Sequence, residues 1–284
     1  MKTKRAFTLV EILTVIVIVS ILATLVTLAV SGAMRAAKRG KIAVEMSQIA
    51  MALEQYKAEF GEYPPDMFDD DALVRHVKKR WPRLDWANMP SASSEAGSIR
   101  QAISDGYGNG VDFTHSDSQI GALALWLGGF PNVDGKLSGF YADPENPFVP
   151  SDTFDKKNVA ELELGKNVQL QNFFGCTVPV IGSEVRDGFA PFVYFRGKTS
   201  GGENAYEETV QRFDFVEFGL CVPYKDTETK WKNPSTYQLI HPGLDGRYGE
   251  AGVRIIQSGV GIGPMDLDNL TNFSDYKELK SILP

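Results

Sequence analysis

The chain opens with Met1-Lys-Thr-Lys-Arg-Ala6, continues with Phe7-Thr-Leu-Val-Glu11, and then runs uncharged from Ile12 to Met34. At about 1.5 Å per residue, a helix over residues 12–33 is roughly 33 Å long, which is enough for one crossing of a lipid bilayer. Glu11 does not fit a simple apolar segment, because burying a carboxylate in lipid costs on the order of a few kcal/mol. The opening therefore predicts a membrane helix whose carboxylate needs a positively charged partner.

Three interpretations of this segment compete. A secretory signal has an apolar core of about 7–15 residues before a small-x-small cleavage site. The pattern Ala29-x-Ser31 fits such a site, but the core here is too long. A plain, uncleaved anchor fits the length and leaves Glu11 to reach the membrane interface. The third interpretation is a short leader removed before Phe7, with the apolar helix retained.

The motif Lys4-Arg-Ala6-Phe7-Thr-Leu-Val-Glu11 resembles the cleavage and methylation motif of type IV pilins and type II secretion pseudopilins. The resemblance implies cutting between Ala6 and Phe7 by a membrane aspartic peptidase, followed by N-methylation of Phe7. It also implies that Glu11 pairs with the Phe7 amine of a neighbouring subunit during assembly. A pair within one helix is a second possibility, since the two residues are four positions apart. Ala6 departs from the family, which usually has glycine there.

The resemblance also implies a location and a set of partners. The location is the bacterial inner membrane, with a single span, a cytoplasmic N-terminus and a C-terminal domain in the periplasm or outside the cell. Charge alone leaves the orientation nearly balanced, because three cations precede the apolar run and four follow it. The implied partners are other pilin or pseudopilin subunits, the prepilin peptidase and methyltransferase, and, indirectly, a membrane platform and an assembly ATPase.

Beyond Arg35 the pattern predicts that the same helix continues in amphipathic form. Apolar residues recur at spacings of four and three: Ile42, Met46, Ile49, Leu53, Tyr56 and Phe60. This spacing places them on one helix face. Gly61 and the Pro64-Pro65 pair end the helix. We expect one helix of about fifty residues, with a membrane-spanning half at 7–34 and an amphipathic half at 35–61.

The remainder divides into a predicted helix and loop insertion at 62–172 and a strand-rich domain at 173–284, while residues 1–6 form the leader. In the insertion we expect helices at 72–81 and 119–127, and a loop at 87–99. Strands are expected at 173–181, 191–196, 212–222, 236–241 and 253–258. Consecutive short strands favour an antiparallel sheet. The predicted fold class is α+β and pilin-like, with the long helix packed on a C-terminal antiparallel sheet.

Size and charge narrow the function classes. The chain has 284 residues and a formal charge of −7, which becomes −10 when the three leader cations are removed. Such an acidic protein is a poor generic binder of nucleic acid. The chain is large for a simple pilin, and phrases such as Leu125–Gly129 and Leu270–Ser274 resemble large prepilin-type proteins of planctomycete-like bacteria.

A metal site is the main chemical candidate. The stretch His241-Pro-Gly-Leu-Asp245-Gly-Arg-Tyr-Gly249 resembles the Gly-rich turn that holds calcium in the major pseudopilin, together with an Asp-containing segment. Asp266, Asp268 and Asn269 would form that second segment. Calcium takes six to eight oxygen ligands from carboxylates, amides and carbonyls, and we predict Asp245, Asp268 and Asn269 as ligands. The alternative is that these residues are ordinary turn formers.

The cysteines and histidines give little evidence of catalysis. Cys176 and Cys221 precede similar Val-Pro phrases, and they either form one disulfide, as suits an exported domain, or stay as two buried thiols. The histidines are scattered, the cysteines lack zinc-site spacing, and no Gly-x-Ser-x-Gly motif occurs. We predict a structural subunit of a type II secretion or type IV pilus-like filament, not an enzyme. The alternative is a filament-tip or membrane-anchored exported binding module that contacts cargo, a surface or DNA.

Overall fold

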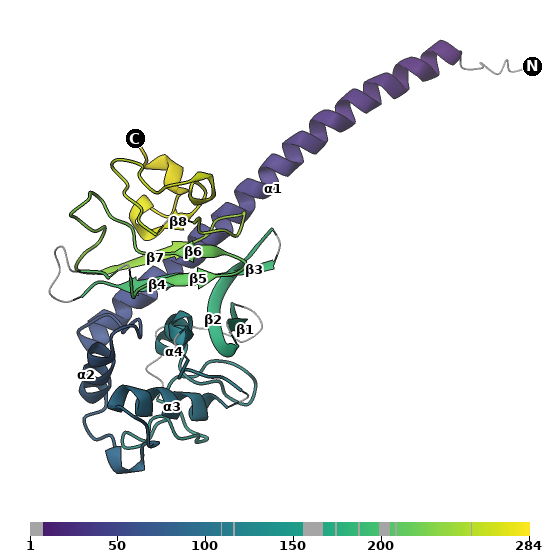
Figure 1. Ribbon diagram of the computed structural model, residues 1–284. Helices are drawn as coiled ribbons and strands as arrows, with labels where there is room; N and C mark the ends of the chain where they lie inside the picture. The colour runs from purple at the N-terminus through teal and green to yellow at the C-terminus, as the bar shows by residue number, and fades with distance from the viewer. Residues whose placement is uncertain are drawn as a thin grey trace, which may run out of the picture. The chain divides into compact units, whose positions relative to one another are not determined.

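Figure 1 shows the computed structural model, which describes residues 8–108, 110–115, 117–155, 167–173, 175–186, 188–198, 205–207, 209–250 and 252–284. The chain divides into two compact units, Met1–Lys41 and Ile42–Pro284. Helix α1, Leu9–Phe60, runs through the boundary between them. The α+β class is confirmed, because a long N-terminal helix is combined with antiparallel strands near the C-terminus.

Helix α1 is 52 residues long and ends at Phe60, which confirms the prediction of one helix of about fifty residues. Gly61 follows with a φ of 77°, a left-handed conformation that glycine adopts without steric cost. Its amide donates a hydrogen bond of 2.7 Å to the carbonyl of Lys57, which closes the last turn.

The unit Ile42–Pro284 contains the other helices and strands of the described residues. Its helices are α2 (Asp70–Arg80), α3 (Glu95–Tyr107) and α4 (Ala122–Gly128). Its strands are β1 (Val168–Phe173), β2 (Cys176–Val185), β3 (Gly188–Pro191), β4 (Val193–Arg196), β5 (Phe213–Phe215), β6 (Gly219–Cys221), β7 (Tyr237–His241) and β8 (Leu270–Thr271).

Within the described residues, the strands form three small antiparallel sheets, where the sequence predicts one. Their orders are β1-β2-β3, β4-β7-β8 and β5-β6, and each pairing of these strands is antiparallel. The expected strand at 212–222 is the β5–β6 hairpin, and the one at 173–181 covers the end of β1 and the start of β2. Residues 253–258, all of them described, contribute one isolated bridge between Ile255 and Lys225.

In the described part of the insertion, α2 and α4 correspond to the two expected helices, while α3 lies where the sequence predicts no helix. Asp69 caps α2 by accepting a hydrogen bond of 3.0 Å from the amide of Ala72. Helix α3 lies partly within the expected loop at 87–99, and Ser94 caps it with a 3.0 Å bond from Gly97. Before α4, the Ser118 hydroxyl donates to the carbonyl oxygens of Phe113 and His115, and Gly129 ends the helix with a φ of 72°.

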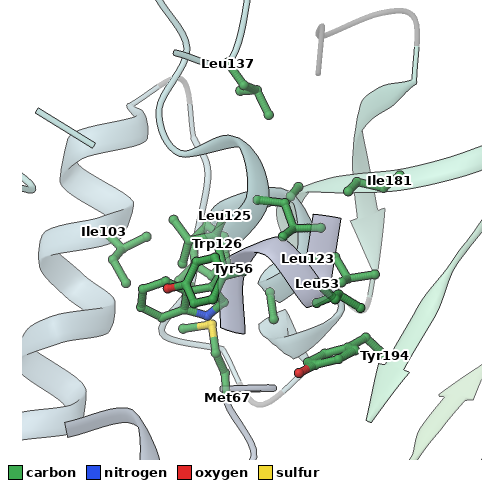
Figure 2. Packing of buried hydrophobic residues seen from close by; sticks show 14 of the residues in the cluster. Leu53, Tyr56, Met67, Ile103, Leu123, Leu125, Trp126, Leu137, Ile181 and Tyr194 are labelled. Atoms are coloured by element: carbon green, nitrogen blue, oxygen red, sulfur yellow. The ribbon is translucent and has the colours of Figure 1, made fainter. Parts of the chain in front are cut away.

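The predicted apolar stripe of α1 forms the centre of the main core. Ile42, Met46, Leu53 and Tyr56 have no exposed surface, and Ile49 is 6% exposed. Figure 2 shows Leu53 and Tyr56 among residues from other elements that complete the cluster: Met67, Ile103, Leu123, Leu125, Trp126, Leu137, Ile181 and Tyr194. Because residues 62–155 supply many of these side chains, they are an integral part of the packed unit.

A chain of buried polar groups fastens the end of α1 to α2 and β4. The Tyr56 hydroxyl lies 2.8 Å from Nε2 of His76, whose Nδ1 lies 3.1 Å from Oε1 of Glu62. Arg196 donates to the other oxygen of Glu62 at 2.9 Å. The hydrogen bond from His76, together with Arg196, lowers the pKa of Glu62 to about 2. Glu62 is therefore held as a carboxylate between a helix and a strand.

Candidate functional site

The N-terminal end of α1 holds the Glu11 carboxylate in a reciprocal capping arrangement with Thr8. Oε2 of Glu11 accepts bonds from the Thr8 amide at 2.7 Å and from the Thr8 hydroxyl at 2.8 Å. The Glu11 amide in turn donates to the Thr8 hydroxyl at 3.2 Å. Thr8 directly precedes the helix and Glu11 is its third residue, so this is a capping box, which satisfies two amides that the helix leaves free.

The capping box explains part of the role of Glu11 that the sequence analysis missed. A Thr followed three residues later by Glu is the sequence signal for such a box, and it was present at Thr8 and Glu11. The predicted cleavage residues Ala6 and Phe7 lie outside the described residues. The pairing of Glu11 with the Phe7 amine therefore stays a prediction. The second oxygen of Glu11, Oε1, takes no part in the box.

Along the apolar half of α1, the described side chains are exposed. The large apolar residues between Leu9 and Met34 that the structure describes are about half exposed or more, with Leu25 and Val26 both at 59%. Within the described part of the chain, α1 is the one helix long and apolar enough to cross a membrane, judged by length and composition. Such an apolar surface is stable in lipid or against other helices, but not in water.

The hydroxyl groups of this segment are satisfied within the helix. Thr14, Ser20, Thr24 and Thr27 each donate to the carbonyl oxygen four residues earlier, at distances of 2.6–2.8 Å. In lipid an unpaired hydroxyl costs free energy, because no water replaces the lost hydrogen bond. These bonds therefore make the polar residues of the segment compatible with a membrane.

The C-terminal loops bring two of the three predicted calcium ligands together. Oδ2 of Asp268 accepts bonds from the amide of Leu244 at 2.9 Å and from that of Asp245 at 3.2 Å. Gly243 permits this approach, since it has a φ of 69° and a Cβ there would lie 2.2 Å from the Asp268 carbonyl oxygen. The turn at 241–249 and the segment at 266–269 are therefore packed directly against each other.

The third predicted ligand, Asn269, is oriented by other groups. Its side-chain amide donates to the hydroxyl of Tyr224 at 3.0 Å and contacts the carbonyl of Tyr248 at 3.4 Å. Its buried Oδ1 has no hydrogen-bond partner among the described residues. Two carboxylates and one unused amide oxygen are donors of the kind that calcium prefers. Within the described residues, however, no three His, Cys, Asp or Glu side chains form a group that could hold a metal.

Asp266 forms a buried ion pair with Arg254. Its Oδ1 lies 2.8 Å from Nε of Arg254, with side-chain exposures of 1% and 0%. The Arg254 N–H does not point along this line, so the contact is an ion pair without an aligned hydrogen bond. Arg254 also donates to the carbonyl of Leu220 at 2.6 Å, and the amide of Gly263 donates to Asp266 at 2.9 Å. The pair ties the C-terminal loops to β6.

The surroundings of Asp245 disfavour the ionised form of its carboxyl group. Although Asp245 lies at the surface, desolvation by the packed loops and the neighbouring charge of Asp268 raise its pKa to about 6. Desolvation likewise raises the pKa of Asp268. Two such carboxylates side by side gain stability from a proton or from a bound cation.

Of the two interpretations of Cys176 and Cys221, the structure has the second, with two free, buried thiols. The alternative of a disulfide between them is not what the structure has, and each cysteine lies in a different hairpin. Cys176 pairs with Phe173 across β1 and β2, and its thiol donates to the Phe173 carbonyl at 3.0 Å. Cys221 pairs with Phe213 across β5 and β6. The similar sequence contexts thus mark two separate hairpins.

Comparison with known proteins places the chain in a family. Residues 1–27 match the family model for the prokaryotic N-terminal methylation motif. The chain is 30% identical over 140 residues to type II secretion system core protein G of Klebsiella michiganensis, covering 47% of this chain and 89% of that protein. It is 32% identical over 148 residues to the protein of the same name from Klebsiella pneumoniae, covering 49% and 96%. No solved structure matches. The chain therefore belongs to the pilin and pseudopilin family that includes type II secretion system core protein G.

Proposed function

We propose that this pilin-like protein is a structural subunit of a type II secretion or type IV pilus-like filament, assembled from the bacterial inner membrane through α1. One observation carries the proposal: a methylation motif at residues 1–27 leads into a helix whose described apolar side chains before Arg35 are exposed. An exposed apolar helix of this length is stable in a bilayer before assembly and against neighbouring helices after it. No further activity is needed to explain the site, so we propose a structural role and not an enzymatic one.

The proposed mechanism begins with cleavage between Ala6 and Phe7 and methylation of the new Phe7 amine. The amine is a cation at the membrane boundary, and Glu11 is an anion close to it in sequence. Thr8 holds one oxygen of Glu11 and leaves Oε1 for a second partner. We propose that this partner is the Phe7 amine of the neighbouring subunit, since neutralising both charges lowers the cost of holding them in lipid.

The membrane topology and the partners follow from the same proposal. The N-terminus lies in the cytoplasm, α1 crosses the inner membrane once, and residues 42–284 lie in the periplasm or beyond. The partners are other pilin or pseudopilin subunits and the prepilin peptidase and methyltransferase. The inner-membrane platform and the assembly ATPase act on the subunit indirectly.

The intact mass of the protein purified from membranes of a host with a prepilin peptidase tests the proposal. We expect a chain that begins at Phe7 and carries one added methyl group, because the motif Arg5-Ala6-Phe7 supplies the cleavage site. A variant with Ala6 replaced by a bulky residue, Ala6→Leu, is the matched control and should keep residues 1–6. A native protein that retains its leader in this host contradicts the proposal.

We further propose that Asp245 and Asp268 bind calcium, with the unused Oδ1 of Asn269 as a third oxygen. In chelator, the raised pKa of Asp245 means that the folded chain binds a proton that the unfolded chain does not bind until about pH 4. The contribution of this carboxyl to stability therefore rises as the pH falls from about 7 to about 4. At pH 7.5, calcium at about 100 times its dissociation constant should raise the melting temperature by roughly 5–10 °C.

Thermal unfolding of the full chain in detergent checks both effects at once. Asp245→Asn should abolish the calcium shift and weaken the stabilisation on acidification. Asp134→Asn, at an exposed loop position, should change neither. A native protein that is unaffected by calcium after chelator treatment would remove the calcium proposal and leave the pH effect to be judged by itself.

A further inference from the structure

Helix α1 carries a dense group of cations directly after its apolar half. These are Arg35, Lys38, Arg39 and Lys41, which we call the basic segment. No acidic residue lies between Glu11 and Glu45. Arg35, Lys38 and Lys41 are exposed, and Arg39 is half-buried. Positions 38 and 39 each lie about one helical turn from position 35, so Arg35 is a near neighbour of both on the helix surface.

The length of the apolar run places these cations at the level of lipid headgroups. Ile12 to Met34 is 23 residues, or about 35 Å of helix, against a hydrocarbon core of about 30 Å. Long basic side chains at the end of a membrane helix extend along the helix toward the headgroups. A Cβ added at Gly32 or Gly40, which lie on either side of Arg35, would meet no atom within 4 Å.

The charge of the rest of the chain is of the opposite sign. Seven of the 29 Lys and Arg residues but one of the 36 Asp and Glu residues precede Ile42, which leaves a formal charge of −13 on residues 42–284. A domain so acidic is repelled by an anionic membrane surface. The net charge of residues 42–284 therefore opposes attraction to anionic lipid, and the basic segment favours it.

Leader cleavage changes the balance between the two ends of the membrane helix. The leader contains Lys2, Lys4 and Arg5, and its removal takes all three cations from the cytoplasmic end. The new Phe7 amine and Glu11 then offset each other at that end. The four cations of the basic segment stay, so the mature helix has a basic anchor at one end only.

We infer that the basic segment is a binding surface for the headgroups of anionic phospholipids in the leaflet facing residues 42–284. The choice of leaflet rests on the proposed function. The preference for anionic lipid does not. After cleavage this surface is the electrostatic anchor of the helix, and the cytoplasmic end is released for movement out of the membrane. The partner is a lipid surface of negative charge, recognised through several exposed cations and no particular headgroup structure.

Lipid selectivity in nanodiscs tests the inference. The cleaved full chain is placed in nanodiscs with trace amounts of spin-labelled phosphatidylglycerol or phosphatidylcholine, and the motionally restricted fraction of each label is measured. We expect phosphatidylglycerol to be preferred over phosphatidylcholine by about twofold or more. Each Lys or Arg near an anionic surface strengthens binding to it by about fivefold. The preference should fall toward one in high salt, which screens exposed charges.

Two variants with equal changes in charge separate the basic segment from net charge. R35Q/K38Q/R39Q/K41Q should remove the preference in the cleaved protein. The control R75Q/K136Q/K230Q/K277Q changes four exposed cations of the other unit and should keep it. In the uncleaved chain, the first variant should retain part of the preference through its leader cations. Melting temperatures of both variants confirm that they remain folded.

A native cleaved protein with no preference for phosphatidylglycerol overturns the inference, and so does a preference that the first variant retains. The proposed function is judged separately. Its failure would appear as a retained leader in the intact mass, or as residues 42–284 on the cytoplasmic side in a protease-protection assay. Neither result depends on the lipid preference.

Discussion

Replacing Glu11 by alanine is expected to leave leader cleavage intact and to reduce incorporation into filaments by more than tenfold. The carboxylate is the one acidic group in the first 44 residues, and the proposed assembly step neutralises it with the Phe7 amine of a neighbour. Losing the pair leaves a cation uncompensated in lipid, which costs on the order of 2–3 kcal/mol or more. Sheared filament fractions, compared with membrane fractions by immunoblot, give the measurement.

The capping box allows a sharper version of this experiment. Glu11→Gln keeps an oxygen that accepts from Thr8 and so preserves the cap, but it removes the charge. If pairing drives assembly, Glu11→Gln should fail as completely as Glu11→Ala. If the cap is what matters, Glu11→Gln should assemble normally, and that result would refute the pairing argument. Circular dichroism in detergent confirms that the helix is retained in both variants.

The second large effect concerns stability. Asp266→Ala is expected to destabilise the folded chain by about 3–5 kcal/mol, because it leaves Arg254 buried without a counter-ion. The same change also removes the acceptor of the Gly263 amide. Chemical denaturation of the full chain in detergent, followed by tryptophan fluorescence, measures the loss. Asp266→Asn should be similarly damaging, since it keeps the shape of the side chain and loses the charge.

A matched surface pair provides the control. Arg83 and Glu145 lie 2.8 Å apart, the same distance as Arg254 and Asp266, but their side chains are 69% and 51% exposed. Arg83→Ala should cost about 1 kcal/mol or less, because water screens the pair and solvates the remaining charge. The double variant R254M/D266L should recover part of the loss. Equal costs for Asp266→Ala and Arg83→Ala would show that burial does not make the Arg254 pair important.

The long helix could be predicted from the sequence because its signals are local. An uncharged run, a spacing of three and four from Ile42 to Phe60, and Gly61 at the end each specify helix within a short window. The structure confirms all three, including the burial of the stripe. The cap of α2 at Asp69 was predictable for the same reason.

Other parts of the structure could not be predicted from the sequence. Some depend on contacts between residues distant in sequence, and in others the residue composition is typical of a different element. Helix α3 begins with Glu95-Ala-Gly-Ser98, whose small and polar residues are typical of a loop, and it is stabilised mainly by burial of Ile99 and Ile103. The tight turns within 173–181 and 212–222 divide apolar runs that read as single strands. The partners of Asp266 and Asn269 could not be predicted, because Arg254 and Tyr224 reach them through the tertiary fold.

The two buried thiols have a practical consequence for experiments on this protein. Burial raises the pKa of Cys176 to about 11 and also raises that of Cys221. Maleimides and related reagents attack the thiolate, so both native cysteines are poor targets at neutral pH. A single cysteine introduced at an exposed position is then the preferred site for a fluorophore or a cross-linker. The native chain can therefore be labelled site-specifically without first replacing its own cysteines.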